Sequence, residues 1–265
     1  MTDHKKEFVK IFQGIDFSKS RYEVFHDFVT LSFCSLAKAA LRGVAWDDRV
    51  NKLEDRYMGI VKTYNRNLDF IRNDMPKLLA HAAMGIDTRC DFLGEVYSDL
   101  EIYNKELGQF FTPFSLSYMN AKLVVGDLRG ELRASKKKYI TVHEPAAGSG
   151  GMLLALKAVM QDQKINAGKC LWFEAIDLSE IAFMMCYIQT SLAGLPGRVT
   201  HGNTLSREIF DSYVTPQGYE FLRQNGNPFK EQDGGCDELQ NPARAHGDVE
   251  IPYTDLFSAQ KRIFS

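Results

Sequence analysis

The spacing of hydrophobic positions in this 265-residue chain changes near its middle. In the first hundred residues, apolar side chains recur at the three- and four-residue intervals of amphipathic helices. This pattern predicts helices over residues 22–41, 47–64, 68–83 and 92–103. Between residues 139 and 201, short apolar runs alternate with helical ones, which is typical of parallel strands joined by helices. The chain therefore predicts an α/β protein with a helical region at its amino-terminal end.

The second region is expected to contain three strands with two helices between them. The strands are predicted over residues 139–143, 170–176 and 198–201, and the helices over residues 152–160 and 181–193. Carboxyl ends of parallel strands meet at one edge of a sheet, where open α/β sheets bind their ligands. We therefore expect any ligand site at the residues that follow these strands.

The first predicted strand is joined to its helix by a glycine-rich turn, Glu144-Pro145-Ala146-Ala147-Gly148-Ser149-Gly150-Gly151. Glycine adopts positive φ readily and lets the backbone approach a ligand, while a helix amino terminus offers unpaired N–H groups. The turn has neither the Gly-x-Gly-x-x-Gly of dinucleotide sites nor the Gly-Lys-Ser/Thr of phosphate loops. The acid and proline before the glycines favour a cationic, phosphate-free ligand with an amino group.

Two polar residues follow the second and third predicted strands. Asp177 comes about thirty residues after the glycine-rich turn, at a spacing where an acid can accept hydrogen bonds from two ribose hydroxyls. Asn203 follows the third strand. Glu144, Asp177 and Asn203 are therefore expected around one nucleotide-like ligand.

A second motif, Gly108-Gln109-Phe110-Phe111-Thr112-Pro113, precedes the glycine-rich turn. In this order the two motifs resemble those of the adenine-N6 DNA methyltransferases, especially the modification subunits of type I restriction systems and related plasmid and phage proteins. The resemblance extends from about residue 92 to residue 204. It implies a Rossmann-like sheet and S-adenosylmethionine as the cofactor. The sheet would be truncated unless the later segments, which read as coil, contain further strands.

The resemblance also implies a role for each motif residue. Phe111 and Thr112 would contact the methionine part of S-adenosylmethionine, Glu144 its amino group, Asp177 its ribose and Asn203 its adenine amino group, which are sensible pairings of donors and acceptors. The residues assigned to the cofactor are Phe110, Phe111, Thr112, Pro113, Glu144, Pro145, Ala146, Gly148, Ser149, Gly150, Asp177 and Asn203.

The resemblance ends before the residues that should bind a target base. Enzymes of the family share an Asn-Pro-Pro-Phe or Asp-Pro-Pro-Tyr tetrapeptide, whose polar groups hold the target amine while its ring stacks on the flipped base. This chain contains no such tetrapeptide, and the nearest segment is Asn227-Pro228-Phe229, the candidate catalytic residues. Residues 221–224 are too polar for the buried strand that should precede them. Residues 213–219 are a second candidate with less resemblance.

Composition and net charge restrict the possible size of the core but not the choice of ligand. With 45% hydrophobic and 25% charged residues, the chain can bury one sizeable core and a smaller helical unit. A net charge of −2 argues neither for nor against DNA, because a duplex needs only a local basic surface. The densest basic patch, residues 136–138 with Arg129 and Arg133, is expected opposite the ligand edge, whereas Arg198, Arg207 and Arg223 are expected to flank it.

Cysteine spacing and hydropathy predict an intracellular setting. The five cysteines are widely spaced and odd in number, so neither a disulfide framework nor a metal site is expected. No apolar stretch approaches the roughly twenty residues that span a bilayer, and the charged start is not a signal peptide. The protein is therefore expected in the cytoplasm, away from membranes.

Three parts and two functions are expected. Residues 1–105 form a helical domain with residues 104–109 as the joint, residues 106–225 an S-adenosylmethionine-binding methyltransferase domain, and residues 226–265 a loop-rich segment. The first function is a DNA methyltransferase acting on adenine N6 in restriction-modification, with DNA as substrate and a specificity or restriction subunit as partner. The second is a catalytically inactive relative that binds S-adenosylmethionine and has a DNA-binding, regulatory or anti-restriction role.

Overall fold

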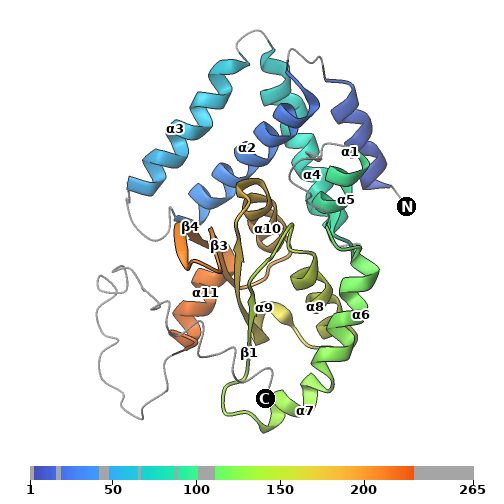
Figure 1. Ribbon diagram of the computed structural model, residues 1–265, viewed down its shortest axis with the longest axis vertical. Helices are drawn as coiled ribbons and strands as arrows, with labels where there is room; N and C mark the ends of the chain where they lie inside the picture. Colours follow the sequence, from blue (N-terminus) through green and yellow to red (C-terminus); the bar gives the residue numbers. More distant parts are fainter. Residues whose placement is uncertain are drawn as a thin grey trace.

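The computed structural model describes residues 3–15, 19–41, 48–64, 67–86, 89–100 and 111–229. Within these residues, a group of amino-terminal helices packs against a four-stranded sheet with its own helices (Figure 1). The amino-terminal helices are α1 (His4–Gln13), α2 (Arg21–Leu41), α3 (Asp48–Thr63), the π-helical turn η1 (Phe70–Asp74), α4 (Met75–Ile86) and α5 (Phe92–Asp99). The later elements are α6 (Phe114–Val125), α7 (Leu128–Ala134), β1 (Ile140–Glu144), α8 (Gly151–Asp162), α9 (Ala167–Cys170), β2 (Leu171–Asp177), α10 (Glu180–Leu192), β3 (Gly197–Asn203), β4 (Glu208–Val214) and α11 (Pro216–Asn225).

The sheet has the strand order β1-β2-β3-β4. Strands β1, β2 and β3 are parallel, with Glu144 opposite Ala175 and Asp177 opposite His201. The prediction of an α/β fold with a helical amino-terminal region is therefore confirmed. The parallel pairing also brings the carboxyl ends of the three predicted strands to one edge of the sheet.

The fourth strand is antiparallel, and the sequence pattern did not reveal it. Strand β4 follows β3 through a turn over residues 204–207, in which Arg207 has φ +64°. Its first three residues are exposed, so it lacks the apolar run of a buried parallel strand. Helix α11 then begins at Pro216, and the Thr215 side chain caps it by accepting a hydrogen bond from the N–H of Gly218. Residues 208–225 are thus a strand and a helix rather than coil.

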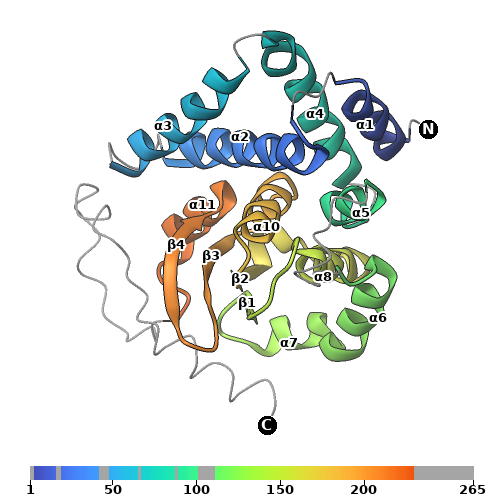
Figure 2. The same ribbon diagram turned by 45° about the horizontal axis from the view of Figure 1, so that its top comes forward.

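The two faces of the sheet are covered by different helices. Tyr213 of β4 packs against Phe183 and Tyr187 of α10, with ring centroids 6.2 and 6.1 Å apart. On the other face, Trp172 of β2 packs against Phe221 of α11 at 5.4 Å. Helix α10 is buried from residue 181 to residue 190 because the sheet lies on one side of it and α2 on the other (Figure 2).

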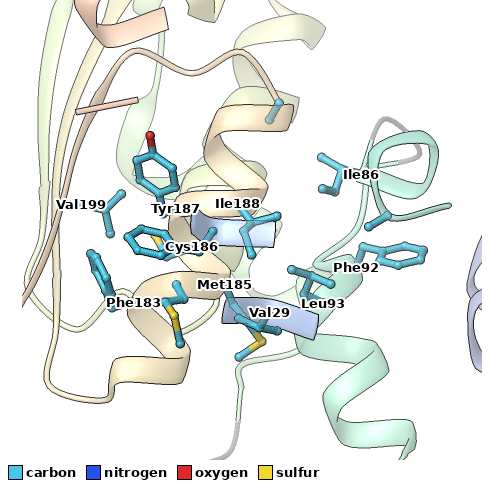
Figure 3. Close-up of a cluster of buried hydrophobic side chains, with 14 of the residues drawn as sticks. Val29, Ile86, Phe92, Leu93, Phe183, Met185, Cys186, Tyr187, Ile188 and Val199 are labelled. Carbon is cyan, nitrogen blue, oxygen red and sulfur yellow. The ribbon is translucent and has the colours of Figure 1, made fainter. Parts of the chain in front are cut away.

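One hydrophobic core joins the amino-terminal helices to the sheet. Phe33 of α2 contacts both α10 and β4, with its ring 5.2 Å from Tyr187 and 5.0 Å from Tyr213. Figure 3 shows Val29 of α2, Leu93 of α5 and Met185 of α10 in one cluster. The predicted joint over residues 104–109 lies outside the described residues, and the described chain on either side of it packs together.

Helix α2 combines the length and composition that could cross a membrane. Its sequence window has a mean hydropathy of 1.3, but most of that window is buried inside the protein. Phe25 and Phe28 of α2 pack against one another and against rings of α1 and α5. The apolar composition of α2 therefore follows from its place in the core between α3 and α10.

Candidate functional site

The glycine-rich turn is tied to the ends of β2 and β3. The N–H of Ala147 donates to the carbonyl of Ile176 over 2.9 Å, and the N–H of Gly148 donates to Oδ2 of Asp177 over 2.7 Å. The hydroxyl of Thr204, directly after β3, donates to the carbonyl of Pro145 over 2.6 Å. These bonds place the turn among the residues that follow all three parallel strands.

Phe111 of the earlier motif lies over this turn. Gly148 has φ +55°, and a Cβ built on it would lie 3.2 Å from Cδ1 of Phe111. The Phe111 ring also packs edge-on against Tyr97 of α5, with centroids 5.5 Å apart. The exposed residues Thr112 and Pro113 follow Phe111 before α6, and the predicted contact Phe110 lies outside the described residues.

The carboxylates of Glu144 and Asp177 are suited to different groups. Burial raises the pKa of Glu144, a hydrogen bond from the N–H of Ala146 acts in the opposite direction, and the nearby charge of Asp177 adds a smaller upward effect. A desolvated carboxylate of this kind is stabilised by a cation. Asp177 accepts from Gly148 at Oδ2 and from the N–H of Ser179 at Oδ1, which leaves each oxygen a second lone pair for a hydroxyl.

Asn203 lies at the same edge, but its amide oxygen is already engaged. Its Oδ1 accepts from the N–H groups of Leu205 and Ser206, over 2.9 and 3.2 Å. The expected bond to an adenine amino group needs that oxygen as acceptor. The side chain has instead its amide N–H groups to offer, which suit a ring nitrogen of a purine.

Two exposed leucines lie beside Asp177 and Asn203 and were not singled out from the sequence. Leu178 directly follows Asp177 and is 60% exposed, and Leu205 follows Asn203 by two residues and is 95% exposed. Apolar side chains beside a carboxylate and an amide give the flat faces of a base something to pack against. The sequence did contain a local sign of these contacts, because Leu178 and Leu205 come shortly after the second and third predicted strands.

Ser149 and Gly150 turn away from the edge where the ligand is expected. The Ser149 hydroxyl donates to Oδ2 of Asp91, and both residues are 2% exposed. A Cβ on Gly150, which has φ +96°, would lie 3.3 Å from Sγ of the buried Cys186. The side of the loop formed by these two residues packs into the protein. Only the backbone of the loop and Gly148 remain for a ligand.

Asp91 and Gln189 were missed by the sequence reasoning. Nε2 of Gln189 donates to Oδ1 of Asp91 over 2.7 Å and to the carbonyl of Ser149 over 2.8 Å. These contacts connect residues that are distant in the chain, so no local pattern reports them. The only local feature at Asp91 was its place before a predicted helix, three residues ahead of Gly94. That spacing indicates an amino-terminal helix cap but not the contacts with Ser149 and Gln189.

The candidate catalytic segment Asn227-Pro228-Phe229 lies at the opposite end of β1. Lys137, which precedes β1, donates from Nζ to the carbonyl of Pro228 over 3.0 Å. Phe229 packs against the cluster that contains Tyr139, directly before β1. Oδ1 of Asn227 accepts from the N–H of Phe229 over 3.0 Å. The structure therefore does not bring this segment to Glu144, which ends β1.

The direction of β4 explains this separation. Because β4 runs antiparallel, its last residue, Val214, lies opposite Arg198 near the start of β3. Residues 213–219, the second candidate segment, are consequently also at the amino-terminal ends of the parallel strands. Helix α11 then continues on that side of the sheet, against β3. A parallel fourth strand would have ended at the opposite edge, beside Asp177 and Asn203.

The basic residues are also divided between the two edges. Lys137 lies at the edge opposite Glu144, as expected. Arg207 lies in the turn after β3, at the ligand edge, whereas Arg198 is near the start of β3 with Nε 3.8 Å from Oε2 of Glu174. Arg223, on α11, pairs with Glu220. Of the three arginines expected at the crevice, the structure places Arg207 there.

A surface hollow lies away from this edge. Its volume is about 390 Å³, and it is found at the end of α8 farthest from the glycine-rich turn. The lining residues are Gly126, Asp127, Arg129, Asp162, Gln163 and Lys164. No group of three His, Cys, Asp or Glu side chains in the described ranges could hold a metal ion.

Three parallel strands of an α/β sheet, with a glycine-rich turn, two acids and an amide at their carboxyl ends, define a nucleotide-type cofactor site. The family model for N-6 DNA methylases matches residues 88–232, which is more than half of the chain. The chain therefore belongs to the N-6 DNA methylase family. No protein with a curated description matches it.

A solved structure from Listeria monocytogenes, described as a class I S-adenosylmethionine-dependent methyltransferase, resembles the chain with 13% sequence identity and a TM-score of 0.40. The match covers 80% of this chain and 57% of that protein. The chain thus spans little more than half the length of the solved protein.

The family's cofactor is S-adenosylmethionine, and the residues at this edge fit it. The cofactor carries an ammonium and a sulfonium, and the desolvated Glu144 carboxylate lacks a described cationic partner among the groups that shift its pKa. Asp177 has free lone pairs for a ribose diol. A Cβ on Gly148 would crowd the ring of Phe111, so glycine lets this ring lie directly on the turn, beside the place where the methionine part is expected.

Proposed function

We propose that the protein is an S-adenosylmethionine-dependent DNA methyltransferase that acts on N6 of adenine in restriction-modification. The observation that supports this most is the convergence of Phe111, Gly148, Glu144 and Asp177 at one sheet edge, within the N-6 DNA methylase match. The bound cofactor supplies an electrophilic methyl group. The protein's contribution is to hold it in line with the target amine and keep water away.

Each residue has a distinct part in that positioning. Glu144 binds the ammonium, and Phe111, packed on Gly148, lies beside the methionine chain. Asp177 accepts from the ribose hydroxyls while holding the loop through Gly148. Asn203 donates to a ring nitrogen of the adenine, and Leu178 packs on its face. Together these contacts fix the direction in which the methyl group points.

DNA is the proposed substrate, with a separate specificity or restriction subunit as the proposed partner. In the described part of the chain, the helical region and the sheet share one core. The proposed partner would supply the choice of DNA sequence. Such a complex would work in the cytoplasm.

One observation favours a second function. The nearest counterpart of the family tetrapeptide, Asn227-Pro228-Phe229, lies at the opposite end of β1 from Glu144. A protein that keeps the cofactor site without this base-holding segment could bind S-adenosylmethionine and act in regulation or anti-restriction instead. In that case binding of the cofactor would persist without methyl transfer.

Two measurements separate the functions. Isothermal titration with S-adenosylmethionine tests the shared cofactor site. Transfer of a tritiated methyl group to mixed genomic DNA, with and without a cell extract that provides partners, tests the enzyme. The methyltransferase proposal expects transfer by the wild type and by Asn227→Ala, and none by Glu144→Ala. Binding without transfer in any condition favours the second function, and no binding overturns both.

A further inference from the structure

Helix α5 contacts the cofactor site at two points. Its capping residue, Asp91, bonds to Ser149 of the glycine-rich turn. Two turns further along, the ring of Tyr97 packs against Phe111, which in turn covers Gly148. One short helix therefore contacts the glycine-rich turn through Asp91 and the Phe111 ring, which lies over that turn, through Tyr97.

The contact at Asp91 is buried, and both oxygens of the carboxylate accept hydrogen bonds. Oδ1 accepts from the N–H of Gly94 over 3.1 Å and from Nε2 of Gln189 over 2.7 Å, and Oδ2 accepts from the hydroxyl of Ser149. Gln189 completes the set, because its Oε1 accepts from the N–H of Leu93 over 2.9 Å. Helix α5, the loop and α10 are thus connected through one carboxylate.

Two glycines allow the three elements to approach so closely. A Cβ on Gly94 would lie 2.3 Å from Oδ2 of Asp91 and 2.7 Å from Oγ of Ser149. A Cβ on Gly151 would lie 2.9 Å from the same carboxylate oxygen. Any side chain at these positions would push α5 away from the loop. The close packing around Asp91 therefore requires glycine at both positions.

A buried carboxylate is costly unless its hydrogen bonds are satisfied. Burial raises the pKa of Asp91, and the nearby charge of Glu95 also raises it, while the bonds from Gln189, Ser149 and Gly94 act in the opposite direction. An amino-terminal cap alone does not need such a site, because exposed Asp127 caps α7 through Gly130 with the same 3.1 Å bond. The buried position of Asp91 thus serves the contact with the loop.

We propose that Asp91 is a positioning residue for S-adenosylmethionine. It touches no cofactor atom. It acts through Ser149, by holding the loop in the shape in which Gly148 and Glu144 meet the cofactor, and it fixes α5 so that Tyr97 keeps Phe111 in place. This role rests on the proposed binding of S-adenosylmethionine at this edge.

The test compares cofactor affinity among four variants of the full chain. Asp91→Ala and Ser149→Ala are each expected to raise the Kd for S-adenosylmethionine about tenfold, and the double variant no more than Asp91→Ala alone, because both changes remove the bond between Asp91 and Ser149. Asp127→Ala is the matched control, because it removes the same kind of helix cap from α7 instead of α5. It should leave the Kd within about twofold of the wild-type value. Circular dichroism checks whether each variant is folded.

Asp91→Asn adds a conservative variant. Its amide can still accept from Gly94 and can donate to the Ser149 hydroxyl, so most of the affinity lost in Asp91→Ala should return. If Asp91→Ala does not fold, Ser149→Ala decides, because it keeps the α5 cap. Unchanged affinity in Ser149→Ala, or fully additive losses in the double variant, would overturn the role. A wild type that binds no S-adenosylmethionine overturns the proposed function first.

Discussion

The backbone N–H of Gly148 donates a hydrogen bond to Oδ2 of Asp177 over 2.7 Å. This bond joins the glycine-rich turn after β1 to the last residue of β2, two segments that lie twenty-nine residues apart. The acid that is proposed to bind the ribose therefore also shapes the loop that receives the methionine part. Changes at either residue should affect the whole cofactor.

Removal of the Asp177 carboxylate should weaken cofactor binding by more than a ribose contact alone. Hydrogen bonds to a charged group contribute about 1.5–3 kcal/mol each, so Asp177→Ala is expected to raise the Kd for S-adenosylmethionine at least about thirtyfold. Isothermal titration measures this. The exposed Asp162, at the far end of α8, provides the control, and Asp162→Ala should bind as the wild type does. Equal affinities in all three proteins would contradict the assignment.

Gly148 and Gly126 offer a matched pair of glycine substitutions. Both have φ +55°, but a Cβ on Gly148 meets Phe111, whereas a Cβ on Gly126 has nothing within 4 Å. Each change to Ala should lower the free energy of unfolding by about 1 kcal/mol through backbone strain. Gly148→Ala should also displace Phe111 and raise the Kd for the cofactor about tenfold or more.

The measurement for this pair combines thermal unfolding with titration of S-adenosylmethionine. Gly126→Ala separates backbone strain from the contact with Phe111. If the two variants lost cofactor affinity equally, a general loss of stability would explain the effect, and Phe111 would not cover the ligand.

Cofactor affinity should depend on pH through Glu144. Burial raises the pKa of Glu144 above its ordinary value, and an ammonium group binds the ionised form. Affinity is therefore complete above that raised pKa and falls as the pH drops through it, by about tenfold per pH unit on the acid side. Binding below the pKa should release a proton. Titration in buffers of different ionisation enthalpy detects this release.

Glu144→Gln is the variant for this experiment. It should bind more weakly at neutral pH and lose the part of the pH dependence that comes from Glu144. Any slope that is left belongs to other buried acids, of which Asp91 also has a raised pKa. A pH profile identical to that of the wild type would show that Glu144 does not bind the ammonium.

Protein stability should fall with rising pH because of Glu174. This residue of β2 is 2% exposed, and burial raises its pKa to about 7, against the charge of Arg198 and a bond from Nε1 of Trp172. An acid with a raised folded-state pKa keeps its proton longer when folded than when unfolded. The free energy of unfolding should therefore decrease from pH 4.5 to about 7, by as much as about 3 kcal/mol, and then level off.

Urea unfolding across this pH range measures the effect. Glu174→Gln removes the titrating group while keeping an acceptor for Trp172, so its stability should stay flatter between pH 4.5 and 7. The exposed Glu220→Gln is the control and should follow the wild type. A wild-type curve that rises over this interval would contradict the prediction.

Elements with strong local signals agree closely between sequence and structure. The predicted helix over residues 22–41 is α2 (Arg21–Leu41), and the predicted strand over residues 170–176 is β2 (Leu171–Asp177). The predicted helix over residues 68–83 begins instead with the π-helical turn η1, and α4 extends to Ile86. Helical and strand periods arise from contacts within a few residues, so the sequence carries them directly.

Strand β4 shows where such local reasoning fails. Residues 208–210 are exposed and the strand lies at the sheet edge, so it has no buried run to mark it. Its antiparallel direction depends on the turn after Asn203 and on pairing with β3. That direction carries Asn227 to Phe229 away from the residues assigned to the cofactor, although their sequence suggested the opposite.

By itself the sequence determined the parallel strands, the glycine-rich turn between them, and Glu144, Asp177 and Asn203 at their ends, because these features depend on neighbours in the chain. Only the tertiary structure decided that Ser149 faces Asp91 rather than the ligand and that the candidate catalytic segment lies at the far end of β1. The physical reason is distance along the chain. Asp91 is 58 residues from Ser149 and 98 from Gln189, so their bonds exist only after the helices and the sheet have packed together.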